Sequence, residues 1–147
     1  MSFNPKKQLA QFLSEDVGKG DITSALLSKK VISANIISRE NAILGGSKYA
    51  KEIFTLKGCK VKIITKDGSK IKPNQTIMKI TGNADKILTC ERTALNIITR
   101  MSGIATHTNE LVKKIPKKTK LYATRKTAPG LRSVSYTHLT LPTSDLV

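Results

Sequence analysis

The chain has 147 residues, which is enough for one ordinary domain with its own buried core. Lysine and arginine number 26 against 10 acidic residues, and the resulting formal charge of +16 favours anionic partners: nucleic acid, acidic membrane surfaces, or small phosphates and carboxylates. An aromatic content of 4%, the absence of tryptophan and the lack of helix-turn-helix or zinc-finger spacing argue against nucleic acid, and no apolar run approaches the ~20 residues that span a bilayer. We expect most of the lysines to form a solvated surface.

The cysteines and the N-terminal residues bear on whether the protein is cytoplasmic or secreted. Cys59 and Cys90 lie far apart and form no CxxC pair, and two histidines make no metal constellation. Buried free thiols in a reducing environment are the favoured interpretation. No apolar segment follows Lys6 and Lys7, so the start of the chain does not look like a signal peptide. The sequence therefore predicts a cytoplasmic protein with no protein-bound metal.

The first predicted element is a helix that begins at Asn4 as N-cap with Pro5 at its first position. Its apolar residues, Leu9, Phe12 and Leu13, have the three-to-four spacing of a helix that buries one side. Glycines at positions 18 and 20 end the helix. A capped turn and a short helix are expected over residues 21–27, and we assign no catalysis to them.

The next stretch predicts an α+β layer, an open-faced sandwich with about four strands and helices on one side. Alternating apolar residues indicate strands over residues 31–39, 59–65 and 76–82, with short extended pieces at 43–44 and at 71. Asp67 and Gly68 form a turn. A helix capped by Ser47 and closed by Gly58 lies between the strands, with apolar residues Ala50, Ile53, Phe54 and Leu56.

A long helical period follows, over residues 84–114, and Gly103 is expected to break it into two helices. Lysines surround Pro116 as an exposed helix end. A short strand over residues 121–123 then delivers Thr124, Arg125 and Lys126 to a turn. Fixed cations at a strand end suit an anion site.

Four motifs in this order carry a family resemblance: EDVGKGDITS at residues 15–24, ERTALN at 91–96, RMSGIAT at 100–106 and TRKTAPGLR at 124–132. Together they resemble quinolinate phosphoribosyltransferase, also called nicotinate-nucleotide pyrophosphorylase (carboxylating), over residues 1–132. The resemblance implies an N-terminal α+β domain at 1–114 and, at 115–132, the first strand of an incomplete α/β barrel. Barrel sites gather at the carboxyl ends of the strands.

The implied reaction joins quinolinate to phosphoribosyl pyrophosphate and releases pyrophosphate and carbon dioxide, giving nicotinate mononucleotide in NAD biosynthesis. The implied substrate-binding residues are Arg92, Thr124, Arg125 and Lys126. In the family, the residue matching Arg92 reaches the neighbouring site across a homodimer interface, and higher homo-oligomers fit equally. Mg²⁺ is implied with the phosphoribosyl donor. No residue is assigned a catalytic role, and neither nucleic acid nor membrane is an expected partner.

The resemblance stops at Arg132, where the basic residues also end. We expect residues 133–147 to be a non-native tail and the chain to be an inactive fragment, and His138 receives no role. A genuine terminal strand with a disordered end is the alternative. Two further functions stay open: a related pyrophosphorylase (molybdenum-transport-associated or nicotinate-using), and a non-catalytic basic module that binds anions or nucleic acid.

Overall fold

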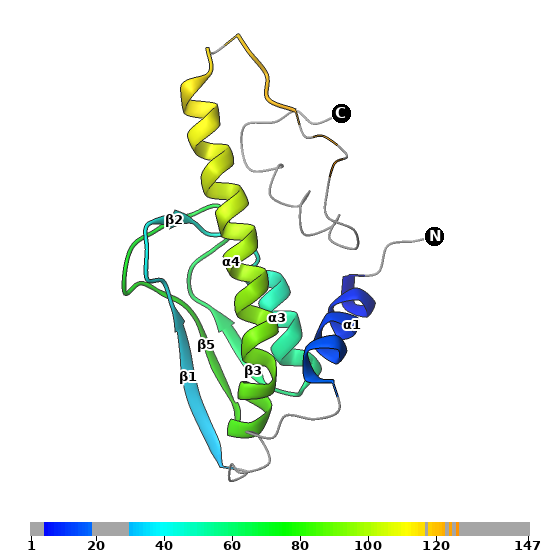
Figure 1. The fold of residues 1–147 in the computed structure, drawn as a ribbon. Helices are drawn as coiled ribbons and strands as arrows, with labels where there is room; N and C mark the ends of the chain where they lie inside the picture. The colour runs from blue at the N-terminus through cyan, green and yellow to red at the C-terminus, as the bar shows by residue number, and fades with distance from the viewer. Residues whose placement is uncertain (1–4, 19–29, 117, 123, 125, 127–147) are drawn as a thin grey trace.

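The computed structural model of the chain describes residues 5–18, 30–116, 118–122, 124 and 126. This part contains a three-stranded sheet, a two-stranded sheet and three helices (Figure 1). The predicted α+β class is confirmed, although the strands divide between two sheets instead of forming one. The expectations for Asn4, for the turn and helix at 21–27 and for the tail at 133–147 lie outside the described residues.

The larger sheet places β5 (Thr76–Asn83) between β1 (Val31–Ile37) and β3 (Lys60–Ile63), with both pairings antiparallel. Ala34 and Val61 both face Ile80 in the register. A register shift between Ile36 and Ile37 lies near the start of β5. Because β5 is paired on both edges, its apolar residues form the centre of the sheet: Ile77, Met78 and Ile80 are all buried.

A small second sheet pairs β2 (Ala42–Ile43) with β4 (Lys70–Ile71). The chain enters β4 through the predicted turn at Asp67 and Gly68, where Gly68 has a φ of 87°. The Gly68 N–H donates to the Leu44 carbonyl at 2.8 Å. This sheet lies beside the upper half of the longest helix (Figure 1).

The helices α3 (Ser47–Leu56) and α4 (Ala84–Lys114) cover one face of the larger sheet, and α1 (Pro5–Val17) packs against these two helices (Figure 1). Along β1, half-buried and exposed residues alternate, so the other face meets solvent. The predicted apolar stripe of α1 is confirmed by Leu9 and Leu13, which are buried. The largest fully buried side chains of the core come from α3, α4, β5 and the segment that follows β2: Phe54, Ile53, Met101, Met78, Ile80 and Leu44.

The prediction that Ser47 caps α3 is wrong. Ser47 is the first residue of the helix, and its N-cap is Gly46, with a φ of 89° and no side-chain cap bond. The Ser47 N–H donates instead to Asp67 Oδ1 at 2.9 Å, so a carboxylate from the distant turn satisfies the free helix end. At the other end, Gly58 closes the helix as predicted, with a φ of 80°, while Leu56 is 41% exposed.

The predicted break at Gly103 is also wrong, because α4 is one continuous helix of 31 residues that includes Gly103. Glycine weakens a helix interior by about 1 kcal/mol, and tertiary contacts on both sides compensate for this loss. Ser102 Oγ accepts a hydrogen bond from the Gly45 N–H at 3.0 Å and also contacts the Gly45 carbonyl at 3.3 Å. Thr106 Oγ1 accepts from the Ile43 N–H at 2.8 Å. These bonds anchor both sides of Gly103 to the segment around β2.

The strand expected at residues 121–123 is absent from its described part. Leu121 and Tyr122 belong to no strand, and both side chains are exposed. Ala123 lies outside the described residues. A strand persists only when a neighbour satisfies its backbone groups, and among the described residues none pairs with this segment.

Candidate functional site

The predicted substrate residue Arg92 lies on an outer face of α4, with its side chain 73% exposed. The next two residues in the sequence, Thr93 and Ala94, are buried. The helical period therefore turns this arginine outward at the point where α4 passes the end of α1. It is held on a rigid helix that contributes buried side chains along most of its length.

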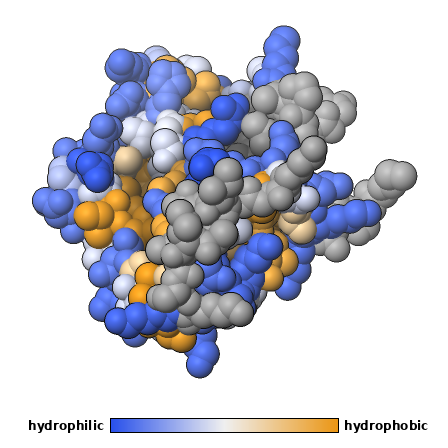
Figure 2. All heavy atoms as spheres, turned by 60° about the horizontal axis from the view of Figure 1, so that its bottom comes forward, coloured by the Kyte–Doolittle hydropathy of each residue, from blue (hydrophilic) through white to orange (hydrophobic). Residues whose placement is uncertain are grey.

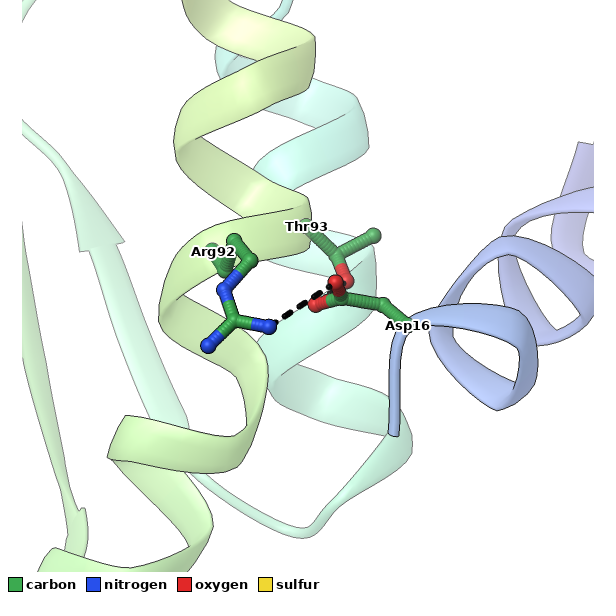
Figure 3. Close-up of polar contacts among 3 residues, drawn as sticks. All are labelled: Asp16, Arg92 and Thr93. Atoms are coloured by element: carbon green, nitrogen blue, oxygen red, sulfur yellow. Dashed lines mark hydrogen bonds and ion pairs between the residues drawn. The ribbon is translucent and has the colours of Figure 1, made fainter. Parts of the chain in front are cut away.

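Asp16, in the last turn of α1, is the partner of Arg92 (Figure 3). Arg92 Nη1 lies 3.4 Å from Asp16 Oδ1. The other carboxylate oxygen, Oδ2, accepts a hydrogen bond from Thr93 Oγ1 at 3.0 Å. The two contacts connect one carboxylate to adjacent residues of α4, one exposed and one buried. Asp16 itself is about three-quarters covered, since 24% of its side chain is exposed.

A groove between α1 and α4 runs beside this cluster and has a volume of about 420 Å³. Residues from both helices line it: Phe12, Glu15, Asp16, Thr93, Asn96, Ile97 and Arg100. Asn96 and Arg100 follow Arg92 at intervals of four residues, so the three polar groups share one face of α4. This face presents nitrogen donors to solvent next to the two acids of α1.

The other predicted substrate residues lie beyond the far end of α4. Thr124 and Lys126 are exposed, and the Lys126 N–H donates to Thr124 Oγ1 at 3.3 Å. Arg125 lies outside the described residues. From Arg92 to the end of α4 at Lys114 the helix is about 33 Å long at the standard rise. Within one chain, the structure therefore does not bring Arg92 together with the segment around Lys126 (Figure 1).

Sequence reasoning missed Asp16 as the partner of Arg92, and it missed the hydrogen bond from Thr93 to the same carboxylate. Asp16 belongs to a segment whose sequence a capped turn accounts for, and it lies 76 residues from Arg92. The available signal was Thr93, a hydroxyl on the buried stripe of a helix. Such a group requires a hydrogen-bond partner.

The two thiols are structural. Cys59 and Cys90 are buried and free, as predicted. Cys90 Sγ donates to the Ile53 carbonyl at 3.5 Å. Burial, followed by the nearby Cys59, raises the pKa of Cys90 to about 12, and burial also raises the pKa of Cys59. Because the thiolate is the nucleophilic form, neither cysteine is a candidate nucleophile at neutral pH.

The surface is basic and solvated. Every lysine whose burial is described is exposed, which confirms the expected lysine-rich surface. Figure 2 shows hydrophilic side chains over much of one face, with hydrophobic areas between them.

Across the described ranges, no three side chains of His, Cys, Asp or Glu gather as metal ligands. These described residues do not fit a protein-held Mg²⁺. Within the same residues, no helix combines the length and the apolar character needed to cross a membrane.

Residues 21–102, which include Arg92, match the family model described as "Quinolinate phosphoribosyl transferase, N-terminal domain". The chain belongs to the quinolinate phosphoribosyltransferase family. The match ends within α4, so it covers both sheets, α3 and the part of α4 that carries Arg92.

Individual members agree with this assignment. The chain is 39% identical to a probable nicotinate-nucleotide pyrophosphorylase (carboxylating) of Bacillus subtilis, over 86% of this chain and 45% of that protein. The solved nicotinate-nucleotide pyrophosphorylase of Francisella tularensis superimposes with a TM-score of 0.84 and 39% identity, over 92% of this chain and 50% of that chain. The enzyme of Ehrlichia chaffeensis gives a TM-score of 0.88 and 32% identity, over 97% and 54%. The chain thus spans about half the length of the relatives it matches. This agrees with the prediction from the sequence that it resembles only the N-terminal part of the family's proteins.

Proposed function

We propose that this chain supplies the N-terminal domain of a quinolinate phosphoribosyltransferase of NAD biosynthesis. In this reaction quinolinate attacks phosphoribosyl pyrophosphate and loses a carboxylate, so that nicotinate mononucleotide, pyrophosphate and carbon dioxide form. The observation that supports the proposal best is the placement of Arg92. It lies in the family-matched segment, it is exposed, and the one ion pair described for it engages a single guanidinium nitrogen.

The chemistry of the substrate suits this arginine. Quinolinate carries two carboxylates, and a guanidinium binds a carboxylate through two parallel N–H donors. The contact of Arg92 with Asp16 uses Nη1 alone, so other N–H groups remain for a ligand. Asn96 and Arg100, on the same face, extend the row of donors along the groove.

The distance between Arg92 and the barrel motif favours a site shared between subunits. In the proposed homodimer or higher homo-oligomer, Arg92 of one chain reaches the site formed by Thr124, Arg125 and Lys126 of its neighbour. Arg125 is the proposed carboxylate ligand there, and Lys126 is a second cation for quinolinate or the phosphoribosyl donor. The corresponding division of the chain is an N-terminal domain at 1–114, the start of the barrel at 115–132 and a tail foreign to the family at 133–147.

The cations also suit the second substrate. Cleavage at the sugar C1 develops oxocarbenium character, and positive groups that hold the departing pyrophosphate stabilise this step. Mg²⁺ would arrive bound to phosphoribosyl pyrophosphate and neutralise part of its charge. The proposed location is the cytoplasm, with neither nucleic acid nor membrane as partner.

A substrate assay tests the proposal. The full-length protein that carries this chain should form nicotinate mononucleotide from quinolinate, phosphoribosyl pyrophosphate and Mg²⁺, measured by chromatography. Nicotinate should replace quinolinate poorly, and a clear preference for it would identify a related pyrophosphorylase instead. The chain of residues 1–147 alone should show no turnover, because most of the barrel has no counterpart in it. Salt-dependent binding of an oligonucleotide without binding of the phosphoribosyl donor would instead indicate a basic binding module.

A further inference from the structure

We propose that Asp16 is a positioning residue that holds the guanidinium of Arg92 ready for the substrate carboxylate. The inference rests on the proposed function, since it assigns Arg92 to the quinolinate site. It concerns a contact between two segments that are far apart in the sequence, the end of α1 and the first part of α4.

Asp16 is itself well fixed. Its helix is anchored in the core by Leu9 and Leu13, which are 2% and 4% exposed. Its Oδ2 atom accepts the 3.0 Å hydrogen bond from Thr93, a residue that is 5% exposed. The carboxylate therefore has a defined orientation before any ligand binds, and its second oxygen is directed at Arg92 (Figure 3).

The contact with Arg92 restrains the arginine without saturating it. One guanidinium nitrogen, Nη1, approaches Oδ1 at 3.4 Å, whereas a two-pronged pair would engage two nitrogens at shorter distances. A guanidinium has five N–H donors, so the outward edge stays available to an incoming carboxylate. An exposed ion pair of this kind is weak in water, and it competes little with a substrate that brings two carboxylates.

A long exposed side chain needs such a restraint, because it otherwise samples many rotamers that binding must freeze out. The ordering of one such side chain corresponds to about a three- to tenfold change in affinity. Loss of Asp16 should therefore act mainly on KM for quinolinate. A carboxylate that only tied α1 to the rest of the domain would act on thermal stability instead.

The chain offers a matched control for that structural role. Lys6 Nζ and Glu52 Oε1 form an ion pair at 3.1 Å that ties α1 to α3. Glu52→Gln removes the charge of one partner from an interhelical pair, as Asp16→Asn does, but Glu52 lies on α3, outside the contacts described for Arg92. The two variants thus separate the attachment of α1 from the positioning of Arg92.

The test uses the full-length protein and measures KM and kcat for quinolinate together with Tm. Asp16→Asn should raise KM by about three- to tenfold with kcat within about twofold, whereas Glu52→Gln should leave KM unchanged. Thr93→Val, which keeps the side-chain shape but removes the hydroxyl, should raise KM in the same direction. Thr93→Ser keeps the hydroxyl donor and should have the same KM as the unaltered protein.

A double-mutant cycle decides whether the effect passes through the arginine. In an Arg92→Ala background, Asp16→Asn should cause no further rise in KM. An equal rise in both backgrounds, or an unchanged KM in both Asp16→Asn and Thr93→Val, overturns the positioning role. If Arg92→Ala by itself leaves quinolinate kinetics unaltered, the proposed function fails at Arg92. If Arg92→Ala is impaired while Asp16→Asn is not, only the positioning role fails.

Discussion

The two halves of α4 use polar side chains in opposite ways. In the C-terminal half, the hydroxyls of Ser102 and Thr106 accept hydrogen bonds from backbone N–H groups around β2, within the protein. In the N-terminal half, Arg92 makes one long contact with Asp16 and remains 73% exposed. A polar group whose hydrogen bonds are satisfied internally supports the fold, and one with donors to spare is available to a ligand. The following variants test this distinction.

The largest effect is expected at Arg92. In the full-length protein, Arg92→Ala should reduce kcat/KM for quinolinate by the equivalent of about 2–5 kcal/mol, because a charge-assisted contact to substrate is lost. Arg125→Ala should have a similar effect. Tm should stay within a degree or two in Arg92→Ala, since the side chain is exposed. Lys113→Ala, an exposed cation in the last turn of the same helix, serves as the control. Kinetics like those of the unaltered protein in Arg92→Ala would remove this residue from the site.

Gly46→Ala should give the largest loss of stability among single-methyl changes. The position has a φ of 89°, and an added Cβ would lie 2.8 Å from Met101 Sδ. Strain and overpacking together should lower the free energy of unfolding by about 1–3 kcal/mol. Urea denaturation followed by circular dichroism measures the change. A variant as stable as the original would mean that the junction between α3 and α4 is more loosely packed than the structure indicates.

Ser102→Ala should destabilise the C-terminal half of α4 without affecting the site. The Gly45 N–H would lose its partner in a buried position, which costs about 1–3 kcal/mol. Thr99→Ala, at an exposed position one turn earlier, should change little and is the matched comparison. We expect KM for quinolinate to be unchanged in Ser102→Ala. A selective rise in KM would contradict the division of α4 into a structural and a ligand-facing half.

The buried thiols give a pH-dependent prediction. The pKa of Cys90 is raised from 9.0 to about 12 in the folded protein, so the unfolded chain releases this proton first as the pH rises. The stability that the neutral thiol contributes is fully present below pH 9 and is lost progressively between pH 9 and about 12. Denaturation curves at pH 8 and 10 should show this decline, and Cys90→Ala should reduce it. In the native protein at pH 8, both thiols should react slowly with a thiol reagent. Rapid labelling at this pH would indicate frequent opening of the core.

The smallest effect is expected at Gly103. An added Cβ there meets no atom within 4 Å, and the residue lies inside a continuous helix. Gly103→Ala should therefore raise the free energy of unfolding by up to about 1 kcal/mol through helix propensity. Thermal denaturation detects this change. A decrease in Tm would show that the glycine is needed for a close approach that the described residues do not include.

Local patterns in the sequence accounted for most elements of the fold. Alternation located β1, β3 and β5, and the three-to-four spacing located α1, α3 and α4, because burial of one face imposes these periods on any sequence. Four motifs in order, one of them around Arg92, indicated the family, and the matched segment confirms it. The charge predicted a solvated lysine surface, and the described lysines form one.

Tertiary contacts decided what local patterns could not. The Ser47 N–H is satisfied by Asp67 from another turn, and α4 continues through Gly103 because Ser102 and Thr106 bind the segment around β2. The partnership of Asp16 with Arg92 and Thr93 spans most of the described chain. The sequence by itself determined the periods and the family, and it singled out Arg92 as a candidate substrate-binding residue. Only the packing of α1 on α4 decided which carboxylate faces that arginine, because a hydrogen bond depends on proximity in space and local periodicity carries no information about distant partners.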